Sequence, residues 1–230
     1  MEDEPRSLGV RLSSVILADE VAMPSDIETF PNLTSSSVQL TQHTLADGKH
    51  CVLTSTLPES LRALAPFDAW WELHPEDYSK IMIHGREVEI PRWQQAYGRD
   101  YHFSGTVNEA LDLTAEMEVV LAWCQQHIDT NLNGLLFNWY DGAEDHYIGA
   151  HRDSRKGLIE DTPIVTISLG EERAFRMRPY KGKGFEDFMV GDGDVLVIPW
   201  DTNLTHTHEV PNAARYSGRR ISITARAFVE

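Results

Sequence analysis

Cysteine, long apolar runs and positive charge are all scarce in this chain of 230 residues. Its two cysteines, Cys51 and Cys124, are too few for a disulfide framework, and we expect both to be small buried side chains. No apolar run approaches the ~20 residues that a membrane helix needs. The acidic N-terminus also lacks the basic start and apolar stretch of a signal peptide. The sequence therefore predicts an intracellular protein, cytoplasmic or nuclear, that makes no use of a membrane.

The shortage of positive charge is uneven along the chain. Lys and Arg number 20 against 36 Asp and Glu, which gives a formal net charge of −16. This balance disfavours a simple nucleic-acid-binding protein, because phosphate binding depends largely on positive charge. Residues 152–183 are the exception, with 8 basic and 5 acidic residues. That stretch is either a solvated surface balanced by neighbouring acids or the place where an anionic partner binds.

The N-terminal part of the chain predicts irregular structure followed by helices. Prolines break any periodicity in residues 1–45. Residues 58–72 indicate a helix interrupted at Pro66, and residues 81–90 indicate a hairpin. The clearest helical signal is the apolar stripe within residues 107–129.

From Gly134 onward the pattern changes to short β runs separated by Gly, Pro and Asp. The expected strands are 134–140, 163–170, 173–178, 185–190, 194–199 and 219–229. Such a series indicates an antiparallel sandwich or jelly roll. We therefore predict an α+β, mainly β fold, a double-stranded β-helix (jelly roll) with an N-terminal helical layer. We expect a monomer in which residues 1–60 form an irregular extension packed on the core and residues 61–230 form one domain.

Two imidazoles and a carboxylate in this β-rich part can form a metal site. His151 and Asp153 are two residues apart in an extended segment, so both side chains project the same way. The third ligand should come from a distant strand, and both His206 and His208 are available there. We favour His208 because of its spacing to the arginines that follow. Two His and one carboxylate can hold iron(II) on one face and leave the opposite face open.

A strand with two arginines follows this possible ligand. Arg220, Ser222 and Arg226 lie on one face of the run Arg220-Ile221-Ser222-Ile223-Thr224-Ala225-Arg226. Two buried guanidiniums are costly without an anion, so they indicate either a bound dicarboxylate or a salt bridge to the protein's own acids. Asn138 and Tyr140 alternate on another strand and can add an amide and a phenol to the same pocket. The combination predicts an oxygenase that consumes 2-oxoglutarate as well as O2.

The motifs, taken in this order, resemble those of the AlkB-like iron(II)/2-oxoglutarate dioxygenases, particularly the nucleobase-repair branch. They cover about residues 81–228 and comprise Pro91-Arg92, Tyr97-Gly98, Tyr101-His102-Phe103-Ser104-Gly105, Asn138-Trp139-Tyr140, His151-Arg152-Asp153, His208-Glu209-Val210-Pro211 and Arg220-x5-Arg226. The combination is specific, although each piece alone is not.

The resemblance implies a role for each matching residue. It assigns His151, Asp153 and His208 to iron, as the catalytic centre. It places Arg220 on the distal carboxylate of 2-oxoglutarate, helped by Tyr140 and Ser222. Arg226 and Asn138 would lie near the carboxylate that chelates the metal. Phe103 and His151 match two rings that stack on a flipped base, with Tyr101 beside them; flipping is needed because a stacked base cannot reach the iron.

Two positions depart from the repair-branch pattern. Arg155 stands where that branch has an acidic residue able to attract a cationic methylated base. His84 stands where duplex-acting members carry an aromatic wedge in a hairpin. Both departures, with the net charge of −16, argue against repair of duplex substrates and favour single-stranded ones.

Three classes of function remain open at this stage. The first is a demethylase of alkylated DNA or RNA bases that releases formaldehyde, succinate and CO2. The second is a hydroxylase of the same fold acting on a small molecule or a protein side chain, where Arg155 would hold an anionic substrate. The third is a binding protein that kept the fold without catalysis, although such a protein has no physical need for the complete set of ligands and arginines.

Overall fold

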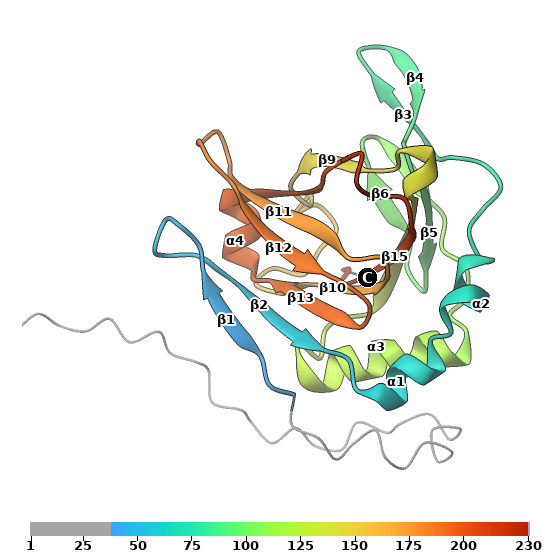
Figure 1. Ribbon diagram of the computed structural model, residues 1–230, viewed down its shortest axis with the longest axis horizontal. Coiled ribbons are helices and arrows are strands. Elements are labelled where there is room, and N and C mark those ends of the chain that lie inside the picture. The colour runs from blue at the N-terminus through green and yellow to red at the C-terminus, as the bar shows by residue number, and fades with distance from the viewer. Residues whose placement is uncertain (1–37, 230) are drawn as a thin grey trace, which may run out of the picture. The chain divides into compact units, whose positions relative to one another are not determined.

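The computed structural model describes residues 38–229, and Figure 1 shows how their strands and helices are arranged. Our prediction of irregular structure for residues 1–37 lies outside the described residues. Within the described range the chain forms two larger sheets, two small hairpins and four α-helices. None of these helices is both long enough and apolar enough to cross a membrane.

The larger sheet has seven antiparallel strands in the order β1-β2-β13-β10-β15-β8-β5. They are Thr41–Thr44 (β1), Cys51–Thr56 (β2), Trp93–Tyr97 (β5), Gly134–Asp141 (β8), Ile164–Gly170 (β10), Asp194–Ile198 (β13) and Arg219–Arg226 (β15). The three adjacent strands β10, β15 and β8 are buried along almost their whole length. Polar side chains on these strands are therefore enclosed by protein.

The smaller sheet has four strands in the order β12-β11-β14-β9. They are Ile148–His151 (β9), Arg173–Pro179 (β11), Glu186–Val190 (β12) and His206–Val210 (β14). One core cluster joins the two sheets, with Ile164 and Leu196 from the larger sheet packed with Phe175, Met177 and Val210 from the smaller one. This pair of packed antiparallel sheets confirms the predicted jelly roll.

The helical layer covers the other face of the larger sheet. Its helices are Glu59–Leu64 (α1), Phe67–Trp71 (α2) and Ala115–His127 (α3), and Figure 1 shows them together on that side. Pro66 separates α1 from α2, as predicted, and the Trp139 indole donates a hydrogen bond to the carbonyl of Trp70. The Thr114 hydroxyl caps α3 by accepting from the backbone N–H of Met117. The fourth helix, Trp200–Thr205 (α4), precedes β14.

The predicted helix over residues 107–129 is wrong at its beginning. Residues Thr106–Asn108 form β7, which pairs with Tyr101–Phe103 (β6). At the end of β7, the Asn108 amide oxygen accepts from the backbone N–H of Ala96, and beyond it the backbone of Leu111 bonds to that of Ala96 and Gly98. Tertiary pairing with the sheet edge thus holds this segment extended until Thr114 caps the helix.

The predicted irregular extension over residues 1–60 is wrong for residues 41–56. There, β2 pairs with β13 inside the larger sheet, and β1 pairs with β2. Val52 and Leu45 are fully buried in the core cluster. This segment is stabilised by pairing to a strand more than 130 residues later in the chain. A local sequence pattern cannot identify such a distant partner, and the strand was therefore missed. A second small hairpin, Lys80–Ile83 (β3) and Arg86–Glu89 (β4), matches the predicted one.

Candidate metal centre and co-substrate pocket

Two neighbouring strands of the smaller sheet bring a metal-ligand triad together. His151 at the end of β9 lies directly opposite His208 of β14 in the strand register. The Asp153 Oδ1 atom lies 3.7 Å from His151 Nε2 and 3.9 Å from His208 Nε2. All three ligand atoms therefore face a common point. His206, the alternative ligand, lies in a different group of residues.

The electrostatics of the triad fit a divalent cation. Asp153 and His208 are buried, and Asp153 Oδ1 has no hydrogen-bond partner in the described structure. Burial lowers the pKa of His208 to about 3, aided by the neighbouring His151. Burial alone would raise the pKa of Asp153, but Arg226 and the two imidazoles hold it below its usual value. Neutral imidazoles and an ionised carboxylate are the forms that bind metal, and an N2O set with open positions is a donor set for Fe(II).

Asp153 is fixed by contacts that the sequence did not reveal. The side chain of Asn203, in α4, accepts from the backbone N–H of Asp153 at 3.0 Å and donates to its carbonyl at 3.2 Å. Arg226 Nε donates to Asp153 Oδ2 at 2.7 Å, which leaves Oδ1 free for the metal. Asn203 is therefore a positioning residue, and no motif signals it.

Arg220 has the surroundings of an anion-binding group. Its side chain is completely buried on β15, and its Nε donates to the Ser168 hydroxyl at 2.9 Å. Both terminal nitrogens lack partners in the described structure. The guanidinium lies 5.3 Å from the ring of Tyr140, its cross-strand neighbour. Burial lowers the pKa of Arg220 to about 10, so the group remains charged at neutral pH. The two unpartnered terminal nitrogens of Arg220 can donate hydrogen bonds to the oxygens of a carboxylate.

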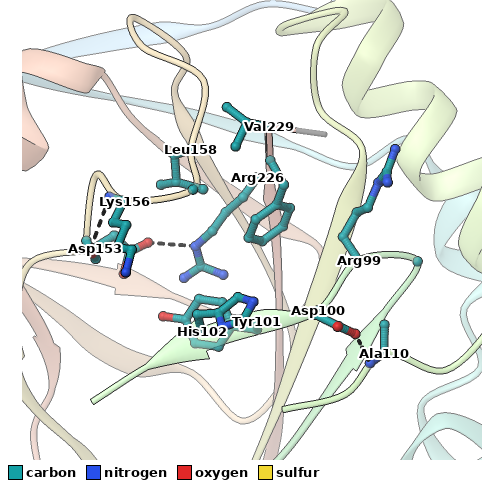
Figure 2. Close-up of a pocket in the computed structure, with 14 residues that line it drawn as sticks. Arg99, Asp100, Tyr101, His102, Ala110, Asp153, Lys156, Leu158, Arg226 and Val229 are labelled. Carbon is teal, nitrogen blue, oxygen red and sulfur yellow. Dashed lines mark hydrogen bonds and ion pairs between the residues drawn. The ribbon is translucent and has the colours of Figure 1, made fainter. Parts of the chain in front are cut away.

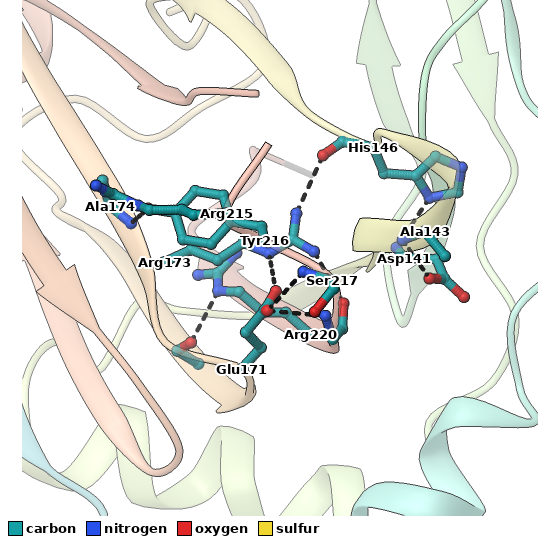
Figure 3. A network of polar contacts seen from close by, with 12 residues as sticks. Asp141, Ala143, His146, Glu171, Arg173, Ala174, Arg215, Tyr216, Ser217 and Arg220 are labelled. Carbon is teal, nitrogen blue, oxygen red and sulfur yellow. Dashed lines mark hydrogen bonds and ion pairs between the residues drawn. The ribbon is translucent and has the colours of Figure 1, made fainter. Parts of the chain in front are cut away.

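A second buried arginine provides the contrast. Figure 3 shows Arg173 in a network in which all its nitrogens donate. They bond to the Glu171 carboxylate and to the carbonyls of His146 and Gly218, at 2.9 to 3.1 Å. Arg173 is thus satisfied by the protein itself, whereas Arg220 is not. The predicted alternative of an internal salt bridge consequently applies to Arg226, through Asp153, and not to Arg220.

A cavity of about 520 Å³ lies beside the triad. It is lined by the predicted co-substrate residues Asn138, Tyr140, Ser222 and Arg226, by the predicted substrate residues Tyr101 and Phe103, and by the ligands His151 and His208. This volume is typical of a small-molecule site. The rings of Tyr101 and Phe103 stack with centroids 5.5 Å apart, so one wall of the cavity is aromatic.

Arg92 is a further charged group on this cavity. It is buried, and its Nε donates to the Asn138 amide oxygen at 2.8 Å. This contact orients the amide so that its nitrogen remains available. Burial lowers the pKa of Arg92. The Pro91-Arg92 motif marked the residue in the sequence, but its place beside Asn138 required the fold. Thr224, on the same face of β15 as Ser222, also lines the cavity.

Arg226, which is paired with Asp153, also lines a second cavity of about 520 Å³, shown in Figure 2. The guanidinium of Arg226 lies 4.8 Å from the ring of Tyr101, and both residues line both cavities. Burial, followed by the charge of Asp153, raises the pKa of Tyr101 to about 12. Tyr101 is therefore a neutral phenol.

The other two predicted substrate residues lie outside the main cavity. His84 is exposed in the turn between β3 and β4, with a φ of 49°, while Ile81 of the same hairpin lines the cavity. Arg155 is exposed in a neighbouring hollow that also contains His151 and Arg152. Neither residue lines the main cavity, so their predicted contact with substrate stays a prediction.

Comparison with known proteins agrees with this geometry. A family model described as the 2OG-Fe(II) oxygenase superfamily matches residues 25–226. The DNA oxidative demethylase ALKBH2 of Arabidopsis thaliana is 28% identical over 120 residues, which cover 42% of this chain and 38% of that relative. The match thus spans well under half of the relative's length. The structure of OsALKBH1 has the same fold, with a TM-score of 0.57 and 13% identity over 81% of this chain and 99% of that one.

Proposed function

The chain is an AlkB-like member of the 2OG-Fe(II) oxygenase superfamily, whose members use Fe(II), 2-oxoglutarate and O2, and we propose that it oxidatively demethylates alkylated bases of single-stranded DNA or RNA. The observation that carries the proposal is the aromatic wall of the cavity beside the triad. The stacked rings of Phe103 and Tyr101 line that cavity, and His151 lines the same space. A flipped base can stack on such rings.

Each part of the site has a role in this proposal. His151, Asp153 and His208 hold the iron, and Arg226 keeps the second oxygen of Asp153 occupied. Arg220 takes the distal carboxylate of 2-oxoglutarate through its two free nitrogens. When bound, iron and 2-oxoglutarate with O2 supply the oxidising power to hydroxylate an N-methyl group, which then leaves as formaldehyde. The protein supplies position and a pocket that excludes water.

Asn138, Tyr140 and Ser222 complete the co-substrate pocket in this proposal. Tyr140 lies opposite Arg220 in the β15–β8 register, and Asn138 lies opposite Ser222. The amide of Asn138, held by Arg92, and the hydroxyls of Tyr140 and Ser222 can then bond the carboxylates of 2-oxoglutarate. These groups position the co-substrate so that one end remains near the metal ligands.

The decisive experiment measures formaldehyde and succinate release from methylated single-stranded DNA and RNA oligonucleotides, with His208→Ala as the blank. We expect wild-type protein to release both products from at least one oligonucleotide and the blank to release neither. Equal signals from wild type and blank on every oligonucleotide would refute the proposal.

Arg155 favours a second candidate, the hydroxylation of an anionic small molecule or protein side chain. Arg155 and Arg152 are both exposed and line the hollow beside the triad, so they give it positive charge. Succinate production that depends on such a substrate, without formaldehyde, would identify this activity.

An Arg155→Glu substitution tests the charge argument within the demethylase proposal. We expect it to raise kcat/KM about tenfold on cationic methylated bases, because an opposite charge at the entrance attracts them. Activity on a neutral methylated base should change little and serves as the matched control. Unchanged or lower activity on the cationic base would contradict the prediction.

A further inference from the structure

A second group of metal-ligating side chains lies outside the catalytic cavity. Asp47 and His50 come from the turn between β1 and β2, and His206 is the first residue of β14. One ligand atom of each residue lies within 4.8 Å of one ligand atom of each other residue. None of the three lines the cavity beside the catalytic triad. The group therefore needs an explanation of its own.

The backbone hydrogen bonds of the turn use only one of the two oxygens of the Asp47 carboxylate. Asp47 Oδ1 accepts from the backbone N–H groups of Lys49 and His50, both at 2.9 Å, which fixes the turn. Oδ2 faces the two imidazoles, 2.5 Å from His50 Nδ1 and 3.7 Å from His206 Nε2. The second oxygen is thus directed at a point between two histidines from distant parts of the chain.

His206 is buried and poorly partnered on the side that faces Asp47. Only 2% of the residue is exposed, and its Nδ1 lies 3.0 Å from the Thr205 hydroxyl. Its Nε2 lies beyond hydrogen-bond distance of Asp47 Oδ2, the nearest acid. The two imidazole rings of His50 and His206 lie 5.4 Å apart at an angle of 63°, so they converge without stacking. The Nε2 atom of this buried residue lies 3.7 Å from a carboxylate oxygen that it does not bond, a spacing that a bridging ion can occupy.

We propose that Asp47, His50 and His206 form a second divalent-cation site, suited to Zn²⁺. Two imidazole nitrogens and one carboxylate oxygen are preferred zinc ligands, and a water molecule can complete a tetrahedron. The ion replaces the proton that lies between His50 Nδ1 and Asp47 Oδ2, and these two atoms separate to ordinary ligand spacing. Asp47 can make that movement because it lies in an exposed turn.

The site has a structural role that follows from where its ligands lie. The ion joins the β1–β2 turn to β14, beside α4 as Figure 1 shows, and the Thr202 hydroxyl of α4 already bonds the Cys51 carbonyl there. His206 and His208 are two residues apart on the same buried face of β14. Fixing His206 therefore fixes the strand that carries a catalytic ligand. The inference is independent of the substrate proposed above.

The test is the number of Zn²⁺ ions bound by the whole chain, measured by elemental analysis after gel filtration and by calorimetric titration. We expect two ions per chain for wild type, one for His50→Gln, one for His208→Ala and none for the double variant. His43→Gln is the matched control, because it removes an imidazole from the adjoining strand β1 that bonds Thr54 and belongs to neither group. It should keep two ions.

A stability measurement separates loss of the site from loss of folding. In the His208→Ala background, Zn²⁺ at a hundredfold excess over its Kd should raise Tm by several degrees, because it binds only the folded chain. The rise should disappear in His50→Gln/His208→Ala and in Asp47→Asn/His208→Ala, while circular dichroism stays native. His208→Ala that binds no Zn²⁺, or His50→Gln that binds as many ions as wild type, would overturn the proposal.

Discussion

Arg220 and Arg173 are both buried, but their surroundings give them opposite effects on stability. All nitrogens of Arg173 donate to protein oxygens, including two backbone carbonyls. Arg220 keeps two nitrogens without partners in the described structure. A buried charge with unsatisfied donors destabilises the folded state, so we expect Arg220 to lower the stability of the co-substrate-free protein.

Arg220→Met should therefore separate stability from binding. We expect it to raise the free energy of unfolding of the co-substrate-free protein by about 1 kcal/mol, because an unsatisfied charge is removed. It should also weaken 2-oxoglutarate binding at least tenfold, which is about 1.4 kcal/mol. Denaturant unfolding and calorimetric titration measure the two effects. Arg173→Met is the matched control and should lose about 3 kcal/mol of stability, because its partners become unsatisfied; equal losses in both variants would contradict this account.

His146 should contribute a pH dependence of stability away from the metal ligands. Its Nδ1 accepts from the backbone N–H of Asp141 at 3.1 Å, and burial lowers its pKa below 6.5. Because the folded pKa is below the unfolded one, the stabilisation is complete above pH 6.5 and is lost as pH falls from that value through the folded pKa. The unfolding free energy of wild type should thus fall more steeply between neutral pH and about pH 5 than that of His146→Gln. Equal slopes for wild type and His146→Gln would contradict this prediction.

Among the structural elements, the β10–β11 turn positions both buried arginines. Gly170 ends β10, pairs with Arg220 in the register and precedes Arg173 by three residues. Its φ is +84°, and an added Cβ would lie 2.5 Å from both the Arg219 carbonyl and the Phe67 ring. The turn therefore needs glycine for its conformation and for the close approach of the helical layer.

Gly170→Ala should cost about 3 kcal/mol of unfolding free energy, since a steric clash adds to the strain of a left-handed residue. Gly184 in the β11–β12 turn is the matched control. It has the same φ of +84° but no heavy atom within 4 Å of the added Cβ, so Gly184→Ala should cost only about 1 kcal/mol. Chemical denaturation of the two variants measures the difference. Equal costs would show that the close contact at Gly170 relaxes freely.

For the whole molecule, the positive stretch at residues 152–183 is less basic than its composition implies. Arg173, Arg176 and Arg178 are paired with acidic side chains. The exposed basic residues beside the triad are Arg152, Arg155 and Lys156. Because the chain as a whole carries a net charge of −16, few cationic side chains are available to bind phosphates.

Binding of a single-stranded oligonucleotide should accordingly depend only weakly on salt. Three phosphate contacts predict a slope of log K against log salt concentration of about −2, at roughly 0.7 per contact. Fluorescence anisotropy across salt concentrations measures the slope, and Lys156→Ala should make it shallower by about 0.7. A slope near −5 would mean that a larger basic surface binds the strand.

The sequence by itself determined the fold class, six of the eight strands from Gly134 onward and the Pro66 break, and it proposed the metal ligands and the co-substrate residues. Those features depend on local periodicity, turn chemistry and the types of side chain, which can be read from residues close together in the sequence. The tertiary structure alone decided that β2 belongs to the larger sheet, that Asn203 holds Asp153, and that His206 faces Asp47 while His208 faces Asp153. Each of these depends on partners far apart in the chain, and such pairings arise only when the two sheets pack together.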